Sequence, residues 1–448
     1  MEMDSDKRLE DIRLEDVAID GKERQDGETF IDPVAEKKLL RKIDFRVIPA
    51  LWLLFLMAFL DRTNIGNARI QGLTEDLKMN GQDYNIALFI FFVPYILFEV
   101  PSNIIIKRIA PSTWLSVIMI LWGIATIGQG LVNTFGGLVG LRFLVGLFEA
   151  GLFPGCVYLI SMYYKRYELQ WRFSLFFCAS ILAGAFGGLL AYALAKMAGI
   201  AGYNGWRWIF IIEGCATVLV GIASKWLVVD WPETASFLNE EERALLVARL
   251  AADAGEAKMN RLDRPAVKRA FGDWKIYTGI LMYFGVGENF GVKLFVLKFM
   301  LTCHLVNTGY ATSFFIPTII KELGYTSAAA QVRSIPIFIV ATVCALTTAV
   351  ITDRLKHRYG FTLLGCAVAA IGYIMLLCQS HIPVGAKYFA VFLITSGGYI
   401  CQPVTIAWVN NNMGGHYKRS ISAAMMVGFG NCGGIVASNV FLTKEAPR

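Results

Sequence analysis

Long runs of apolar residues recur along this chain, separated by short polar segments. Most runs are about 20 residues long, which at a helical rise of about 1.5 Å per residue matches the roughly 30 Å hydrocarbon core of a bilayer. We expect eleven membrane spans, at residues 47–68, 85–106, 113–132, 137–161, 173–194, 208–229, 276–320, 335–352, 361–377, 388–409 and 421–441. The pattern therefore predicts an all-α membrane protein.

Composition supports this fold class. The chain has 448 residues, of which 56% are hydrophobic and 17% are charged, and its mean hydropathy is +0.52. One soluble core cannot bury that much apolar surface. The nine cysteines are scattered singly and form no CxxC pair, so we interpret them as small packing residues rather than as bridges or metal ligands. We expect no metal site and no cofactor.

Basic residues gather in segments that would share one side of the membrane. These segments are 107–108, 164–172, 230–275, 353–358 and 416–419, whereas segment 132–137 on the opposite side has no lysine or arginine. Because basic short loops stay in the cytoplasm, the N-terminus and the central loop are predicted to be cytoplasmic. The net charge of +7 then reflects topology and not nucleic-acid binding, with an anion-attracting patch as the alternative.

The polar segments divide the chain into four parts. We expect a disordered cytoplasmic tail without a signal peptide at 1–45, a six-helix half at 46–230, a cytoplasmic linker at 231–274 and a second half of about five helices at 275–448. Within the linker, residues 239–252 have the capping and apolar spacing of an amphipathic helix.

The stretch FLDRTNIGNA at the end of the first span places polar groups in an apolar run. At helical spacing Asn64 and Asn67 share one face, while Arg62 lies on another. Charges in hydrocarbon cost about 2.5 to 3.5 kcal/mol each on insertion scales, so those present face a cavity or a partner. An arginine donates two parallel hydrogen bonds to a carboxylate. The alternative is that Asp61 and Arg62 only mark the membrane boundary.

Three further spans carry ionisable groups. Glu99 precedes Pro101 in the second span, where it either gates or pairs with Lys107 or Arg108. In the fourth span, Arg142 and Glu149 lie seven residues apart on one face, too far to pair with each other. Glu213 lies about two turns into the sixth span, after a tryptophan and arginine belt.

The second half replaces these ions with amides and hydroxyls. In the segment QPVTIAW, Gln402 offers an amide, Pro403 can locally unwind the helix, and Trp408 can stack on a planar ring. The sequence therefore predicts a cavity that is charged on the side of the first half and neutral on the side of the second.

Five segments taken together strongly resemble fungal major facilitator proteins of the anion:cation symporter family, the allantoate, nicotinate and pantothenate permease group. They are FLDRTNIGNA, LFEVPSNIIIKR, RFLVGLFEAGLFPG, SMYYKRYELQWR and GWRWIFIIEG, and the resemblance runs from about residue 39 to 439. It implies a major facilitator fold of two six-helix halves and proton-coupled uptake of small organic anions by alternating access. It also implies that the polar residues of the first span lie at the cavity, that Arg142 belongs to a coupling motif, and that the basic turns after Ile106 and Thr352 are gates.

The chain departs from this family in two places. It ends after the eleventh span, so we expect the second half to lack its twelfth helix. Residues 287–305 interrupt the seventh span, and removing them would restore a continuous apolar helix. We hypothesise a retained intron, which sequencing of spliced transcripts would test, with a genuine insertion loop as the alternative.

We predict a secondary active transporter that carries a small organic carboxylate such as nicotinate together with protons. We expect a monomer in the plasma membrane, and no enzyme, because the chain has no GxSxG or Walker motif and no histidines at metal spacing. An efflux transporter for a secondary metabolite and a nutrient sensor that transports nothing stay open as alternatives. The expected substrate-binding residues are Arg62, Asn64, Asn67, Arg142, Gln402 and Trp408. The expected proton carriers are Asp61, Glu149 and Glu213, and the expected gating residues are Glu99, Lys107, Arg108, Asp353 and Arg354.

Overall fold

The computed structural model describes most of the chain as a bundle of long helices. It describes residues 32–106, 108–165, 168–254, 272–284, 315–355, 357–378 and 382–411, together with 425, 426, 430, 431 and 435. No strand occurs among these residues, so the expected all-α class is confirmed. Segments 287–305 and 416–419 lie outside the described residues.

The first half contains ten helical segments before the linker helix. They are α2 (Pro33–Ile70), α3 (Leu73–Asp76), α4 (Asp83–Phe89), α5 (Phe92–Ile106), α6 (Pro111–Leu131), α7 (Phe135–Glu149), α8 (Leu152–Tyr163), α9 (Leu169–Ala195), the 3₁₀ turn Ile200–Gly202 and α10 (Gly205–Leu227). The linker helix is α11 (Glu240–Ala254), and the second half contains α13 (Trp274–Phe284), α16 (Ser327–Leu355), α17 (Arg358–Leu377) and α18 (Val384–Asn411).

Eight helices among the described residues are long and apolar enough to cross a membrane. They correspond to eight of the eleven expected spans. The second expected span is divided between α4 and α5, neither of which is long enough alone. The seventh and eleventh expected spans extend into residues that the structure does not describe.

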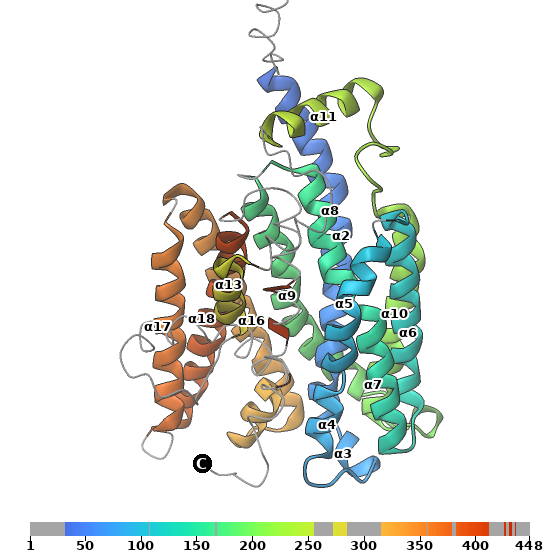
Figure 1. Ribbon diagram of the computed structural model, residues 1–448. Helices are drawn as coiled ribbons and strands as arrows, with labels where there is room; N and C mark the ends of the chain where they lie inside the picture. The colour runs from blue at the N-terminus through green and yellow to red at the C-terminus, as the bar shows by residue number, and fades with distance from the viewer. Residues whose placement is uncertain are drawn as a thin grey trace, which may run out of the picture.

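The helices form two groups that lie side by side (Figure 1). In one group α2 packs against α9 and α10, and α10 packs against α6; in the other, α18 packs against α16 and α17. The groups meet where α9 lies along α16. We call the end of the bundle that carries the linker helix the α11 end, and the opposite end, where α3 and α4 lie, the α3 end (Figure 1).

Helix α2 extends beyond the bundle at the α11 end (Figure 1). It begins at Pro33, which suits the first helical position, and the Asp32 side chain accepts hydrogen bonds from the backbone N–H groups of Val34 (3.0 Å) and Ala35 (3.3 Å). The expectation of a disordered tail up to residue 45 is therefore wrong for residues 33–45. This part of α2 is amphipathic, since Leu39 is buried while neighbouring basic residues stay exposed.

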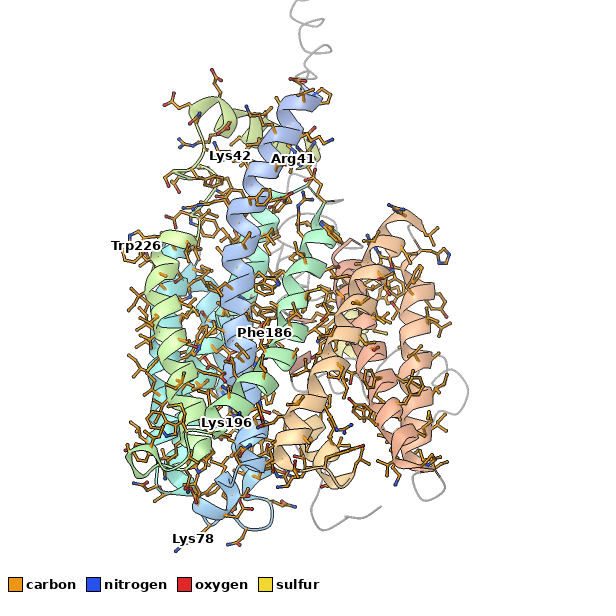
Figure 2. The ribbon with its side chains drawn as sticks, turned by 180° about the vertical axis from the view of Figure 1, so that it is seen from behind. Arg41, Lys42, Lys78, Phe186, Lys196 and Trp226 are labelled. Atoms are coloured by element: carbon orange, nitrogen blue, oxygen red, sulfur yellow. The ribbon has the colours of Figure 1, made fainter. Side chains whose placement is uncertain are left out.

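Charged side chains lie at both ends of the bundle. Figure 2 shows Arg41 and Lys42 at the α11 end, and Lys78 and Lys196 toward the α3 end. The Trp226 side chain is 70% exposed at the end of α10, where aromatic rings commonly anchor a helix at the membrane surface. The apolar part of the bundle lies between these two levels.

The crossing of α9 and α16 is unusually close at the α3 end. A Cβ atom built on Gly188 of α9 would lie 2.7 Å from the Ser334 hydroxyl and 2.9 Å from the Gln331 carbonyl oxygen of α16. Nearby, Gln71 donates a hydrogen bond to the Gln331 side chain (3.2 Å), and Ser327 donates to the Ile70 carbonyl (3.0 Å). The two halves are therefore in direct contact at the α3 end.

Candidate functional site

Arg62 of α2 and Glu149 of α7 form a buried ion pair inside the first half. Their side chains are 4% and 1% exposed. The two residues are distant in sequence and meet because α7 ends at Glu149 beside the C-terminal third of α2. Removing either partner would leave a buried charge uncompensated, which is strongly unfavourable.

Aromatic rings surround the Arg62 guanidinium. Its central carbon lies 5.0 Å from the ring centre of Phe59, 4.9 Å from that of Phe91 and 5.0 Å from that of Tyr95. Aromatic faces attract a cation, and more strongly where water is excluded. The ion pair and the rings together fix the position of this side chain.

Asp61 points to the other side of α2, toward α6 and α10. One of its carboxylate oxygens, Oδ2, accepts hydrogen bonds from the Trp122 indole (2.9 Å) and the Thr217 hydroxyl (2.7 Å). The Asp61 side chain is buried. Two donors on one oxygen hold the carboxyl group against the helix pair α6 and α10.

The remaining polar residues of α2 contact two different helices. The Asn64 amide donates a hydrogen bond of 2.6 Å to Glu213 of α10, and both side chains are buried. Asn67 instead faces α9, since its amide nitrogen lies 3.6 Å from the position that a Cβ atom would take at Gly187. The polar side chains of the first span therefore contact four neighbouring helices, α6, α7, α9 and α10.

Arg142 of α7 and Glu99 of α5 are buried and have polar atoms that make no hydrogen bond among the described residues. Arg142 is 2% exposed, and its Nε and one terminal nitrogen have no hydrogen-bond partner among the described residues. Glu99 is 1% exposed, and neither of its carboxylate oxygens has a hydrogen-bond partner there. Buried polar groups are usually satisfied, so both side chains carry unused hydrogen-bonding capacity.

We call Asp61, Arg62, Asn64, Glu99, Arg142, Glu149 and Glu213 the charged cluster. All seven side chains are buried within the first half and contributed by α2, α5, α7 and α10. The contacts join Arg62 to Glu149, and Asn64 to Glu213. None of these side chains is exposed at the surface, which is the position that a boundary role would require.

The other predicted site residues lie elsewhere. Arg108 and Arg354 are exposed, while Lys107 and the side chain of Asp353 are outside the described residues. Gln402 is half-buried on α18, in the second half. Trp408 lies on the same helix with its ring centre 6.2 Å from that of Tyr359 on α17. The structure thus places Gln402 and Trp408 in the opposite half from the charged cluster.

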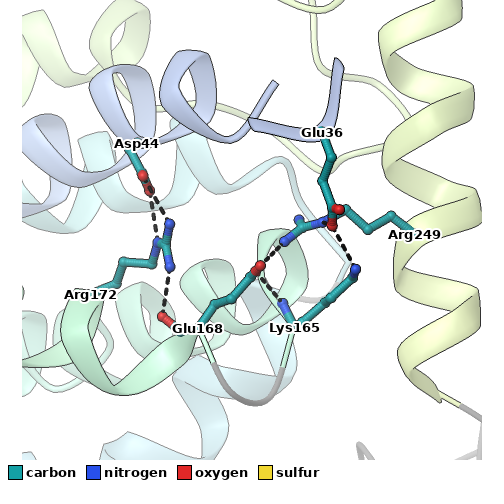
Figure 3. Close-up of polar contacts among 6 residues, drawn as sticks. All are labelled: Glu36, Asp44, Lys165, Glu168, Arg172 and Arg249. Carbon is teal, nitrogen blue, oxygen red and sulfur yellow. Dashed lines mark hydrogen bonds and ion pairs between the residues drawn. The ribbon is translucent and has the colours of Figure 1, made fainter. Parts of the chain in front are cut away.

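A second ionic network lies outside the bundle, at the α11 end (Figure 3). We call it the ionic clamp. Arg249 of α11 is fully buried, donates a 2.7 Å hydrogen bond to Glu36 of α2 and forms an ion pair with Glu168, which precedes α9. Lys165 also donates to Glu36 (2.6 Å). These pairs fix the linker helix to the first half.

Two further contacts extend the clamp along α2. Arg172 binds Asp44 through two parallel hydrogen bonds of 2.8 and 2.9 Å (Figure 3). Lys42 donates a 2.5 Å hydrogen bond to Glu242 of α11, which holds the pKa of the Glu242 carboxyl below its usual range. The start of α2 is therefore held from both sides, by α9 and by α11.

Sequence reasoning identified the ions of the charged cluster but not all of their partners. Trp122 and Thr217, which both donate to Asp61, were not singled out because a tryptophan and a threonine in an apolar span look like packing residues. The ionic clamp was also missed, since Glu36 was assigned to the tail and its partner Arg249 lies in the linker. The charge-rich composition of the linker helix was the available signal.

The arrangement offers a transporter's chemistry more readily than an enzyme's. The charged cluster contains two guanidinium groups able to hold an anion and several carboxyl groups able to hold a proton. Across the part of the chain that the structure describes, no group of three or more histidine, cysteine or acidic side chains is arranged to hold a metal ion.

Several proteins with sequences similar to this chain are described as transporters. A protein of Schizosaccharomyces pombe described as an uncharacterized transporter is 36% identical over 414 residues, which cover 92% of this chain and 79% of that protein. The major facilitator-type transporter hxnP of Emericella nidulans is 32% identical over 431 residues, covering 94% of this chain and 83% of hxnP. The MFS-type transporter cnsO of Penicillium expansum is 34% identical over 430 residues, covering 94% of this chain and 80% of cnsO.

Solved structures share the fold at low sequence identity. The crystal structure of a D-xylose-proton symporter has a TM-score of 0.63 and 15% identity, covering 88% of this chain and 90% of that one. A bacterial homologue of the lysosomal transporter Spinster, in an inward-facing and unoccupied conformation, has a TM-score of 0.62 and 19% identity, covering 87% of this chain and 79% of its own. The sequence profile of the Major Facilitator Superfamily matches residues 51–438. This chain is a multi-pass membrane transporter of the major facilitator superfamily.

Proposed function

We propose that the protein is a secondary active transporter that moves a small organic carboxylate, of the nicotinate type, together with a proton. Transport proceeds by alternating access, in which the two helical halves rock about the site between them. The N-terminus and the linker helix lie in the cytoplasm, so the α11 end is the cytoplasmic end. This proposal rests on the chemistry of the charged cluster.

The unsatisfied guanidinium of Arg142 is the observation that carries the proposal. Both Arg62 and Arg142 are buried, but Arg62 is already engaged by Glu149 and by three aromatic rings. Arg142 has two nitrogen atoms without a hydrogen-bond partner among the described residues. A carboxylate accepts two parallel hydrogen bonds from one guanidinium, so Arg142 is the residue to which we assign the substrate.

We assign the proton to Glu149. Its carboxyl group is ion-paired with Arg62 and has one oxygen, Oε2, without a hydrogen-bond partner among the described residues. Protonation would remove the negative charge of Glu149 from the charged cluster, and the resulting gain in positive charge would strengthen the binding of an anion to Arg142. Proton binding and anion binding would then favour the same state of the cluster, which is the thermodynamic requirement for coupling.

Glu213 and Asp61 have supporting roles in this assignment. Glu213 accepts a hydrogen bond from Asn64, and Asp61 accepts two from Trp122 and Thr217. These contacts fix the orientation of α2 against α6 and α10. The orientation of α2 in turn sets the direction in which Arg62 points.

Uptake of a panel of radiolabelled acids into proteoliposomes tests the proposal. Uptake of nicotinate, pantothenate, allantoate and short dicarboxylates would be measured with the outside more acidic than the inside, and again after this pH gradient has been collapsed. We expect gradient-dependent accumulation of at least one acid, and loss of that accumulation in Arg142→Gln. Arg46→Gln serves as the control, because Arg46 is exposed and, among the described residues, donates to the Trp226 carbonyl outside the charged cluster. Accumulation that survives collapse of the gradient would remove symport from the proposal.

A further inference from the structure

Two cysteines of the second half lie in contact although they come from different helices. Cys366 of α17 and Cys401 of α18 have their sulfur atoms 3.7 Å apart. Both side chains are buried, Cys401 completely. The Cys401 thiol also lies 3.2 Å from the Thr362 carbonyl oxygen, to which it donates. Among the cysteines that the structure describes, no other pair is in sulfur–sulfur contact.

The backbones of α17 and α18 approach each other closely at this point. A disulfide requires Cα atoms about 4.4 to 6.8 Å apart, whereas helix axes are usually about 8 to 10 Å apart. The crossing of α17 and α18 is tightened by Gly365 and Gly397, since a Cβ atom on Gly397 would lie 2.5 Å from the Gly365 carbonyl oxygen. The cysteines flank this contact, one residue beyond Gly365 and one turn beyond Gly397.

We propose that Cys366 and Cys401 form a peroxide-reactive dithiol that closes to a disulfide within the membrane. Neighbouring thiols react in this way when one sulfur takes up oxygen and the second resolves it. The oxidant is a hydroperoxide, either hydrogen peroxide or an oxidised lipid, both of which reach the bilayer interior.

The chemistry balances in two steps. Cys366, the more accessible of the pair at 6% exposure, attacks the peroxide, whose O–O bond breaks to give a sulfenic acid on Cys366 and an alcohol or water. The Cys401 sulfur then attacks the sulfenic sulfur, so that an S–S bond forms, the S–O bond breaks and water leaves. Thr362 is placed to guide the proton of Cys401, because its carbonyl oxygen already accepts the thiol hydrogen bond.

The cross-link would restrain α18 beside its internal proline. Pro403 follows Cys401 by two residues, and a proline inside a helix removes a backbone hydrogen bond and permits bending there. Joining Cys401 to α17 fixes the segment on one side of this flexible point. Cysteines that served only as small packing residues would not restrain α18 in this way.

Peptide mapping of the full-length protein in membranes tests the inference. Membranes are treated with hydrogen peroxide, free thiols are blocked with N-ethylmaleimide, and the tryptic peptides are analysed by mass spectrometry. We expect the peptides that contain Cys366 and Cys401 to be joined, with a combined mass about 2 Da below that of the two free peptides, and to separate on treatment with dithiothreitol. The link should be lost in both Cys366→Ser and Cys401→Ser.

Cys378→Ser is the matched control. Cys378 is exposed and lies on the same tryptic peptide as Cys366, so its replacement distinguishes a link through Cys366 from one through its neighbour. The link should persist in this variant. Alkylation of both Cys366 and Cys401 after peroxide treatment, or irreversible oxidation of Cys366 without a link, would overturn the proposal.

Discussion

The contact between α9 and α16 at the α3 end gives a prediction about conformational change. Gly188 of α9 is buried, and a Cβ atom there would lie 2.7 Å from the Ser334 hydroxyl and 2.9 Å from the Gln331 carbonyl oxygen. Gly188→Ala therefore places a methyl group against the partner half. The serine hydroxyl can rotate, but the carbonyl belongs to the backbone and moves only with α16.

The expected size of the effect follows from overpacking. Inserting one methyl group into a close contact costs about 1 to 3 kcal/mol. Alanine also favours the helix by about 1 kcal/mol relative to glycine, but this gain is present whether the halves touch or separate, so it cancels from the ratio of the two states. Since about 1.4 kcal/mol is a tenfold change, the population open at the α3 end should rise about 5 to 150-fold.

Thiol labelling measures this population. Gln331 is fully buried, so a cysteine introduced by Gln331→Cys reacts with a membrane-impermeant reagent only when the α3 end opens. Labelling at this position would be followed by mass spectrometry in Gly188→Ala and in a control, Gly140→Ala. Gly140 lies in helix α7 and has open space where a Cβ atom would be placed.

We expect the labelling rate in Gly188→Ala to be several-fold higher than in Gly140→Ala. The increase in rate can be as large as the increase in the population that is open at the α3 end. Equal labelling rates in the two variants would show that the α9–α16 contact does not hold the α3 end closed. Labelling that is faster in both variants than in Gln331→Cys alone would indicate that added helix propensity, and not the contact, controls opening.

Three further predictions concern the ionic clamp and the charged cluster. Arg249→Met should destabilise the attachment of α11 by about 1–3 kcal/mol, less than for a fully buried pair because both acidic partners are partly exposed, and should speed proteolysis of the linker. The pKa of the Glu242 carboxyl is lower in the folded protein than in the unfolded chain. The stability that this carboxylate gives to the attachment of α11 is therefore fully present above the unfolded pKa and is lost as the pH falls through the folded pKa. The protection factors of the α11 amides, which correct for the intrinsic pH dependence of exchange, should accordingly fall at acidic pH in the wild type, and this fall should be smaller in Lys42→Gln; an identical profile in both would contradict the assignment. Trp122→Phe should cost about 1–3 kcal/mol by removing a donor from Asp61, measured as thermal stability in detergent, and an unchanged midpoint would be the contrary result.

The fold could be predicted from the sequence because an apolar run of bilayer length crosses the membrane as a single α-helix. Backbone groups must be satisfied inside each helix, so apolar length alone located eight of the spans. Helix α2 was mistaken at its start because a charged segment can be either a solvated tail or an amphipathic helix. Its pairing with α9 and α11, which decides between them, depends on residues far away in sequence.

The candidate site was predictable in its members and not in its pairings. Arg62, Arg142 and Glu149 were identifiable because buried ions are costly in hydrocarbon. Helical spacing excluded a direct pair within α7. It could not show that Glu149 meets Arg62 on α2, or that two Arg142 nitrogen atoms make no hydrogen bond within the described part of the chain. Those contacts follow from the relative rotation of packed helices, which side-chain volumes over the whole bundle determine.

The most direct measurement of the central claim is proton movement coupled to substrate in proteoliposomes. On addition of a transported acid, the wild type should take up protons in proportion to the acid, as reported by a dye for internal pH. Glu149→Gln, which keeps the shape of the Arg62 partner but cannot carry the proton, should exchange labelled acid across the membrane while moving no protons. Proton uptake by Glu149→Gln equal to that of the wild type would contradict the account.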